Sequence, residues 1–202
     1  MKKKILAIGA ALTVLIFGGI YMYNKLTKPN FGPKTTKLYQ RGFRFLEEQI
    51  GIYIKEHYKG IEKIEFSPIY VTGDDGSSML NAYVRPTIYD KYGHKATLGV
   101  PVKKFIPLSY GLSSDIILDF DGSGDEVIEL MDSEDRLVDV SKAKHLPNEA
   151  KLTKARSTDE NISLLVQDGQ LKDVVKDEEG SPEAEIVYNV ELQKGVAQYD
   201  SK

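Results

Sequence analysis

A stretch of 19 residues without a charged side chain lies near the start of the chain and constrains what the rest can fold into. It runs from Ile5 to Tyr23, and only Thr13 within it is clearly polar. At 1.5 Å of rise per residue, a helix of this length reaches roughly 28 Å, close to the hydrocarbon thickness of a bilayer. The sequence therefore predicts a transmembrane helix over residues 5–23.

The charges around this stretch predict its orientation. Lys2–Lys4 precede it, whereas Lys25 and Lys28 follow it. Excess positive charge favours the cytoplasmic side, so three lysines against two indicate a cytoplasmic flank over residues 1–4 and an extracellular C-terminal domain. A removable signal peptide would have a shorter apolar core that ends in small residues. This stretch ends in bulky tyrosine and methionine, and we expect an uncleaved, single-pass anchor in the cell membrane.

The charge of the remaining chain restricts its partners. The first 29 residues hold five lysines and no acid, so the rest carries 22 basic against 30 acidic residues, a net charge of −8. Such a surface repels nucleic acid, because binding to phosphates depends on lysine and arginine. It suits a basic protein partner or a divalent cation. The alternative is that the charge only keeps the domain soluble.

A helical pattern follows a short spacer over residues 24–34. Across residues 35–58 apolar side chains recur at steps of three and four, which places them on one helix face. They are Tyr39, Phe43, Leu46, Ile50, Tyr53 and Ile54. Gly42 and Gly51 weaken a helix and therefore indicate close packing or a bend. We expect Gly60 to end the helix in a left-handed turn.

After this helix the apolar period changes to two, the repeat of a half-buried strand. The pattern predicts strands at residues 64–70, 80–88, 97–105, 116–120 and 127–131. Pro68, Pro86 and Pro101 interrupt the first three, which places each at a sheet edge or at a break. The last two flank Asp121–Gly124 (DGSG), a strong hairpin signal.

The last part of the chain returns to helical patterns. Ser157 and Glu160 resemble a capping box that opens a helix, and a second helical piece is expected over residues 171–176. Residues 185–192 alternate in polarity and predict a closing strand. Residues 196–202 have the composition of a tail.

Together these elements predict an α+β fold. After the N-terminal transmembrane helix we expect one extracytoplasmic domain over residues 35–195. In it one long helix packs on a mostly antiparallel sheet, with a further helical segment and a closing strand.

A calcium site is the sharpest local candidate. Asp119, Asp121, Ser123 and Asp125 alternate around a glycine-rich turn, and calcium prefers several hard oxygen ligands. The first positions resemble the opening of an EF-hand loop. The bidentate glutamate that should close the loop is missing, because Leu130 stands at its position. The alternative is a plain hairpin turn, in which aspartate and glycine supply the turn geometry.

Signs of catalysis are missing from the sequence. His57, His94 and His145 lie in three separate contexts, and cysteine is absent, which excludes disulfide bonds and thiolate chemistry. No serine-nucleophile motif and no glycine-rich phosphate loop occurs. We therefore expect no enzyme and no cofactor other than a calcium ion.

Two groups of side chains predict a protein-binding surface instead. Tyrosine supplies contact area at low entropic cost, and acidic residues attract a basic partner. The candidates are Tyr83, Tyr89, Tyr92 and Tyr110, with Glu126 and Glu129. The alternative is half-buried tyrosines beside a solvated charged face.

The order of a basic start, the apolar stretch 5–23 and an acidic outer domain resembles the TipC-type membrane-anchored immunity proteins of Gram-positive bacteria. The resemblance is one of layout and assigns no residue a role. It implies an immunity or inhibitor protein that neutralises a secreted, basic antibacterial toxin by direct binding. The alternatives are an accessory subunit of a cell-envelope or secretion complex, and a calcium-binding surface domain.

Overall fold

The computed structural model describes residues 26–102, 108–112 and 114–197. The expected transmembrane helix over residues 5–23 and its flank over residues 1–4 lie outside these ranges. Within the described ranges no helix is both long enough and apolar enough to cross a bilayer. Even the longest of them fails, because acidic and basic residues run through its whole sequence. The predicted fold class is therefore corrected to an α+β domain whose described part contains no membrane-spanning helix.

The long helix predicted from the apolar stripe is confirmed. Helix α2 spans Pro33–His57, and the fixed backbone of Pro33 suits its first turn. Gly60 adopts the expected left-handed conformation, with φ of 86°. However, it does not end the helix, because the short strand β1 (Tyr58–Lys59) lies between them. The extended backbone of Tyr58 is what ends α2.

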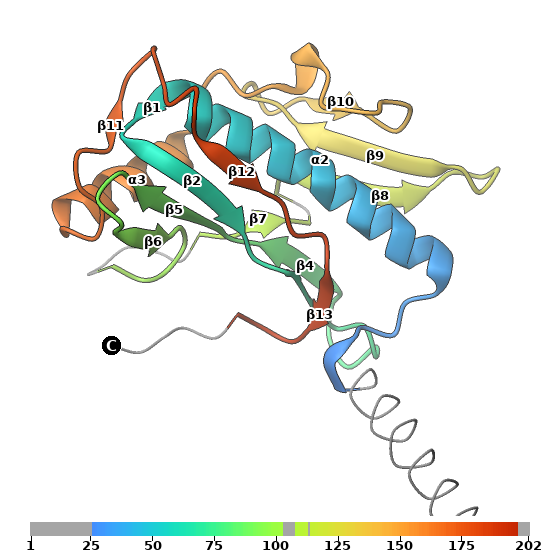
Figure 1. Ribbon diagram of the computed structural model, residues 1–202. Coiled ribbons are helices and arrows are strands. Elements are labelled where there is room, and N and C mark those ends of the chain that lie inside the picture. Colours follow the sequence, from blue (N-terminus) through green and yellow to red (C-terminus); the bar gives the residue numbers. More distant parts are fainter. Residues whose placement is uncertain (1–25, 103–107, 113, 198–202) are drawn as a thin grey trace, which may run out of the picture.

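Eight short strands build two four-stranded sheets that continue into one another (Figure 1). The first has the order β12 (Glu185–Val187), β2 (Ile61–Phe66), β5 (Pro86–Asp90) and β6 (Lys95–Thr97). The second has the order β13 (Leu192–Lys194), β3 (Ile69–Thr72), β4 (Asn81–Val84) and β7 (Tyr110–Gly111). Ser67 and Arg85 join the halves through a 3.0 Å hydrogen bond from Ser67 N to Arg85 O. The predicted break at Pro68 falls at this junction.

The expectation of a mostly antiparallel sheet is confirmed, whereas the expectation of a single closing strand is wrong. Strand β12 pairs in parallel with β2, and β13 pairs in parallel with β3, so both sheets are mixed. Residues 188–191 separate the two strands. The chain reaches β12 through a long connection that contains a helix, and such a crossover is what parallel pairing requires.

A third sheet lies apart from these two. It has the antiparallel order β10 (Leu137–Asp139), β9 (Glu126–Met131) and β8 (Ile116–Phe120). The hairpin predicted around residues 121–124 is confirmed as the connection between β8 and β9. The strand predicted over residues 97–105 is wrong for residues 98–102, which form a turn and loop after β6, and residues 103–107 lie outside the described ranges.

Helix α3 (Arg156–Gln167) follows a short 3₁₀ turn, η1 (Asn148–Ala150). The predicted capping box is wrong, because Ala155 occupies the cap position and Glu160 pairs with Arg156 instead. The helical piece predicted over residues 171–176 is also wrong. Its end forms strand β11 (Val175–Lys176), which pairs antiparallel with β1.

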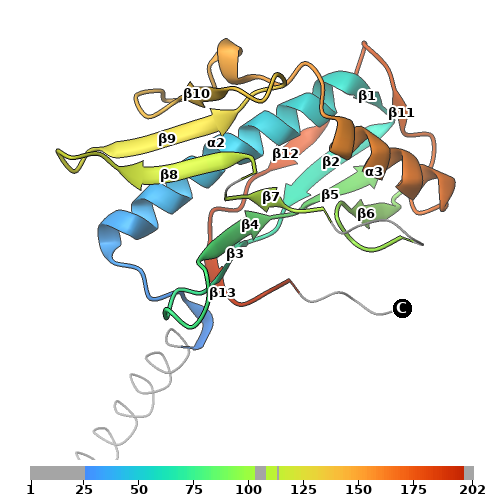
Figure 2. The same ribbon diagram turned by 180° about the vertical axis from the view of Figure 1, so that it is seen from behind.

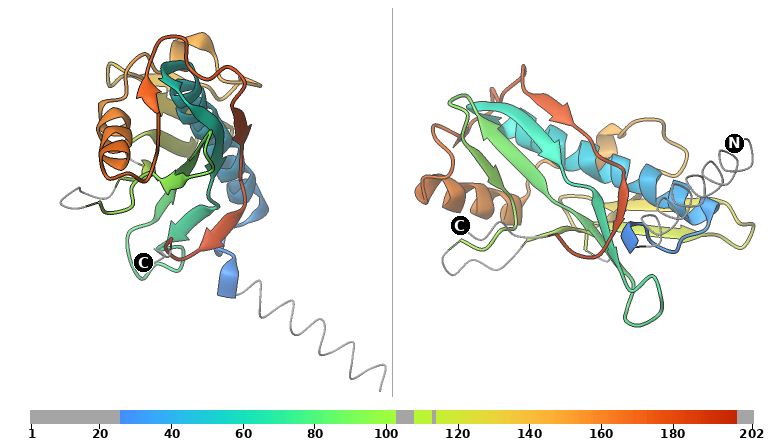
Figure 3. Two further views of the ribbon diagram at one scale, coloured as in Figure 1. Left: turned by 60° about the vertical axis from the view of Figure 1, so that its left-hand side comes forward. Right: turned by 60° about the horizontal axis from the view of Figure 1, so that its bottom comes forward.

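Helix α2 lies between the β8–β10 sheet and the strands β2 and β12 (Figures 1 and 2). The two glycines of α2 make this double contact possible. A Cβ atom on Gly42 would lie 2.3 Å from Leu118, and one on Gly51 would lie 3.0 Å from Ile186. Of the two alternatives predicted for these glycines, close packing or a bend, close packing is the one observed. Figure 3 shows α3 at one end of the domain. The β3–β4 loop projects from the domain at a different place.

Candidate functional site

A cleft of about 820 Å³ opens between α2, the end of β9 and the start of α3. Residues of α2 line it together with three stretches that are distant in sequence: residues 108–110 with 114–115, residues 131–135, and residue 152 with 154–160. Among its described lining residues, acids outnumber bases by six to two. The acids are Asp115, Asp132, Glu134, Asp135, Asp159 and Glu160, and the bases are Lys154 and Arg156.

The bases neutralise only part of this charge. Lys154 lies 2.8 Å from Glu134, and the Arg156 guanidinium lies 2.8 Å from Glu160. Both pairs are well exposed to solvent, where an ion pair contributes little because water screens it. A third acid, Asp132, is paired by Arg136 from outside the lining, at 2.7 Å. The cleft therefore keeps an excess of negative charge.

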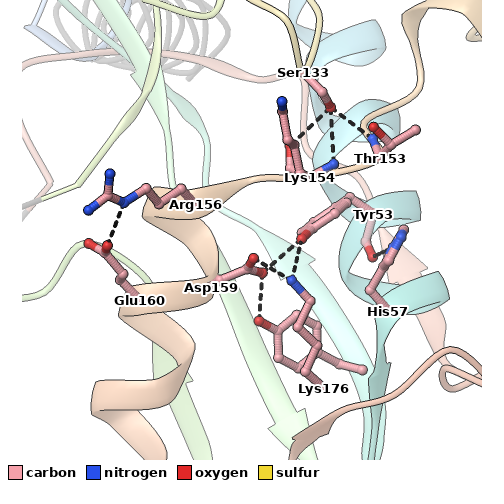
Figure 4. Close-up of polar contacts among 10 residues, drawn as sticks. Tyr53, His57, Ser133, Thr153, Lys154, Arg156, Asp159, Glu160 and Lys176 are labelled. Atoms are coloured by element: carbon pink, nitrogen blue, oxygen red, sulfur yellow. Dashed lines mark hydrogen bonds and ion pairs between the residues drawn. The ribbon is translucent and has the colours of Figure 1, made fainter.

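A single serine fixes the rim of the cleft (Figure 4). Ser133 Oγ accepts hydrogen bonds from the backbone N–H groups of Thr153 at 2.8 Å and Lys154 at 3.1 Å. The same hydroxyl donates to the carbonyl of Lys154 at 3.0 Å. Because these bonds join the β9–β10 turn to the segment that leads into α3, the two acidic walls are held together.

Asp159 joins the start of α3 to three side chains from other elements of the fold (Figure 4). Its Oδ1 accepts hydrogen bonds from the hydroxyls of Tyr53 at 2.8 Å and Tyr58 at 2.7 Å. Its Oδ2 accepts one from Lys176 Nζ. Burial, and then the hydrogen bond to Asp159, raise the pKa of Tyr53 and of Tyr58. Both hydroxyls therefore stay protonated, as donors.

Asp115 differs because no cation among the described residues pairs with it. Its Oδ2 accepts hydrogen bonds from Ser114 Oγ at 2.6 Å and from Gly111 N at 2.8 Å. Burial raises the pKa of Asp115, and the ion pairs among the described residues do not include it. A positive charge brought into the cleft by another molecule would stabilise this carboxylate.

The structure separates the residues predicted to bind a partner. Tyr83 and Tyr89 lie on the main sheets, and Tyr110 is buried, with its hydroxyl 2.7 Å from Thr158 Oγ1. Tyr92 is exposed in the β5–β6 turn. The two acids of that set, Glu126 and Glu129, are on β9 in the third sheet. Of these residues only Tyr110 lines the cleft.

The candidate calcium ligands Asp119, Asp121, Ser123 and Asp125 lie at the β8–β9 turn. Asp121 Oδ1 accepts hydrogen bonds from the backbone N–H groups of Ser123 at 2.8 Å and Asp125 at 2.9 Å. These bonds lower the pKa of Asp121. Asp119 Oδ1 accepts a bond from Phe120 N at 2.7 Å. Across the described ranges, no group of three or more His, Cys, Asp or Glu side chains is placed to hold a metal. The calcium site stays a prediction.

Sequence reasoning missed the cleft as a whole. Its key residues, Asp115 and Asp159, lie 44 positions apart and no local motif connects them. Only the density of acids near residues 132–135 was a usable signal. Comparison with protein-family models, curated proteins and solved structures finds no match for this chain.

Proposed function

We propose that this protein is a binding protein that neutralises a basic protein partner, and that the acidic cleft is where the partner docks. The observation that supports this proposal is the excess of carboxylates over cations around one concave site. A cleft lined by one sign of charge concentrates the field and speeds the capture of an oppositely charged partner. The biological role that fits such binding is that of an immunity protein against a secreted antibacterial toxin.

Asp115 gives the cleft a specific point of attraction. A lysine or arginine side chain of the partner would meet a partly desolvated carboxylate there, without competition from a described cation. Charge-assisted hydrogen bonds of this kind are about twice as strong as neutral ones. Asp135, on the exposed turn between β9 and β10, adds a further negative charge at the entrance.

Binding is favoured over catalysis because Asp159, the second carboxylate considered in the cleft, already accepts hydrogen bonds from the protein itself. Three side chains of the protein itself donate to Asp159. A general base needs a free lone pair directed at its substrate. The arrangement therefore suits a rigid docking wall better than an active site.

Location at the outer face of a cell membrane is part of the proposal. The lysines and the apolar stretch within the first 25 residues are what support it. An extracytoplasmic position would place the cleft where a secreted toxin arrives.

Capture and protection experiments test the proposal. The tagged full chain is used to capture proteins from cultures that produce a toxin encoded beside its gene, and cells lacking the gene are challenged with that toxin. We expect the toxin to be captured and the gene to restore survival. Failure of both would overturn the proposal. Crosslinking that recovers only resident envelope proteins, with no toxin, would favour an accessory subunit of an envelope or secretion complex.

A further inference from the structure

Large apolar side chains are exposed at the end of the domain where the described chain begins. Met79 and Leu80 belong to the loop between β3 and β4, with exposed fractions of 89% and 39%, and Leu26, the first described residue, is 70% exposed. Single exposed apolar residues are common on soluble proteins, whereas several at one place mark a surface that contacts something else. None of the three lines the acidic cleft, so a partner bound there does not account for them.

One carboxylate holds the β3–β4 loop beside the start of the described chain (Figures 1 and 2). Asp74 Oδ2 accepts hydrogen bonds from Asn30 N at 2.8 Å and from Lys194 Nζ of β13 at 3.2 Å. The Asp74 side chain is only 1% exposed, so little water competes for these bonds. Since Asn30 is four residues beyond Leu26, the exposed residues of the loop and of the chain start belong to the same end of the molecule.

The loop has a defined shape at its base. Thr72 and Asn81 are the last residue pair of β3 and β4 before the loop. Gly73, with φ of 76°, lies so close to the returning strand that a Cβ atom on it would be 2.4 Å from the carbonyl oxygen of Met79. The exposure of Met79 is therefore a property of a closed turn.

The chain that precedes Leu26 indicates what covers this end of the domain. It includes Ile5–Tyr23, which has no charged side chain, and only Asn24 and Lys25 lie between that stretch and Leu26. With the protein at the outer face of a cell membrane and this stretch in the lipid, Leu26 lies at the membrane surface. The loop that is bonded to Asn30 then lies beside the same surface.

The charges at this end are compatible with a lipid surface. Lys194 Nζ lies 3.2 Å from Asp74 and 3.9 Å from Asp75, and Lys28 pairs with Glu191. Unpaired acids would be repelled by the anionic headgroups of a membrane. Because each of these acids has a lysine beside it, the repulsion is reduced.

We propose that Met79 and Leu80 insert into the headgroup layer of the membrane, an inference that rests on the membrane location in the proposed function. Apolar side chains gain free energy by leaving water at this boundary, into which interfacial segments reach about 5–10 Å. The β3–β4 loop is then a second contact between the domain and the lipid, next to the one at Leu26. Two contacts restrict the tilt of the domain, and thereby set the direction in which the acidic cleft faces.

Tryptophan fluorescence of the full chain in vesicles tests this contact. The chain has no tryptophan of its own, so Met79→Trp introduces a single reporter. The vesicles consist of phosphatidylcholine with bromine on the acyl chains near the headgroups, which quenches tryptophan on contact. The matched control is Tyr92→Trp, at a 57% exposed position in the β5–β6 turn, away from the β3–β4 loop (Figure 1). Relative to vesicles without bromine, we expect the reporter at position 79 to lose most of its emission and the reporter at position 92 to keep it.

Flotation of the same vesicles separates the loop contact from the membrane location. A chain that floats with the vesicles but shows equal emission loss at positions 79 and 92 keeps the location and overturns the loop contact. A chain that does not float overturns both. Emission at position 79 that responds to protein concentration and not to bromine would mean that a second copy covers the loop, which also overturns the lipid contact. Leu80→Trp provides a second reporter in the same loop, and we expect it to be quenched as well.

Discussion

The phenol of Tyr53 donates a hydrogen bond to Asp159 at 2.8 Å, across 106 positions of the sequence. Tyr53 belongs to α2 and Asp159 to α3. The same carboxylate also accepts hydrogen bonds from Tyr58 of β1 and Lys176 of β11. One side chain therefore connects two helices and a two-stranded sheet. Because α3 forms a wall of the acidic cleft, this connection also sets the shape of the proposed docking site.

Replacing this carboxylate should destabilise the fold. Asp159→Ala removes three hydrogen bonds and leaves the buried Tyr58 hydroxyl without its acceptor. We expect a loss of about 2–4 kcal/mol in the free energy of unfolding, measured by urea denaturation. Glu160→Ala is the control, because its carboxylate is exposed and pairs only with Arg156 on the surface. An equal loss in both variants would contradict the role assigned to Asp159.

The sequence predicted α2 and the β8–β9 hairpin, because neighbouring residues determine the structure of both elements. The apolar stripe of residues 35–58 identified α2 because each turn repeats the same burial. The DGSG turn identified the β8–β9 hairpin because its geometry is set by the residues of the turn itself. Gly42 and Gly51 indicated close packing because a missing side chain in a helix has few other uses.

Non-local pairing explains what the sequence did not reveal. Residues 175–176 have no periodicity that distinguishes a strand from a helix, and their pairing with β1 decides the outcome. Between the two closing strands the backbone bonds to side chains of α2, since Glu47 accepts from Asn189 N and Gln40 donates to Val190 O. The cleft was equally hidden, since three distant segments build it.

Gly60 and Gly93 both have left-handed backbones, and together they distinguish the cost of backbone strain from the cost of a steric clash. A Cβ atom on Gly93 would meet nothing within 4 Å, whereas one on Gly60 would lie 2.1 Å from the carbonyl oxygen of Asp173. We expect Gly93→Ala to cost about 1 kcal/mol, from backbone strain alone. Gly60→Ala should cost about 3 kcal/mol or more, because a backbone atom must also move. Thermal unfolding of both variants measures the difference, and similar costs would refute the predicted collision.

The buried Glu47 predicts how stability depends on pH. The folded state keeps its proton up to about pH 8, whereas the unfolded chain releases it near the ordinary value of 4.5. Between these values the folded state binds more protons, so the stability falls as the pH rises. Glu47→Gln removes this penalty and should stabilise the protein by about 4 kcal/mol at pH 8. The gain should vanish near pH 4.5, and denaturant unfolding at both pH values measures it. A gain that does not change with pH would contradict the assignment.

The charge of the cleft should control the capture of a basic partner. Glu134→Gln with Asp135→Asn removes two negative charges from the rim, and both residues lie on the exposed turn after β9. We expect the affinity to fall about tenfold, mainly through a slower association rate, as measured by surface plasmon resonance. The matched control, Glu62→Gln with Glu183→Gln, removes two exposed charges that do not line the cleft. Salt screens exposed charges, so the difference between the two variants should shrink as the ionic strength rises. An equal loss in the control would mean that net charge, and not the cleft, attracts the partner.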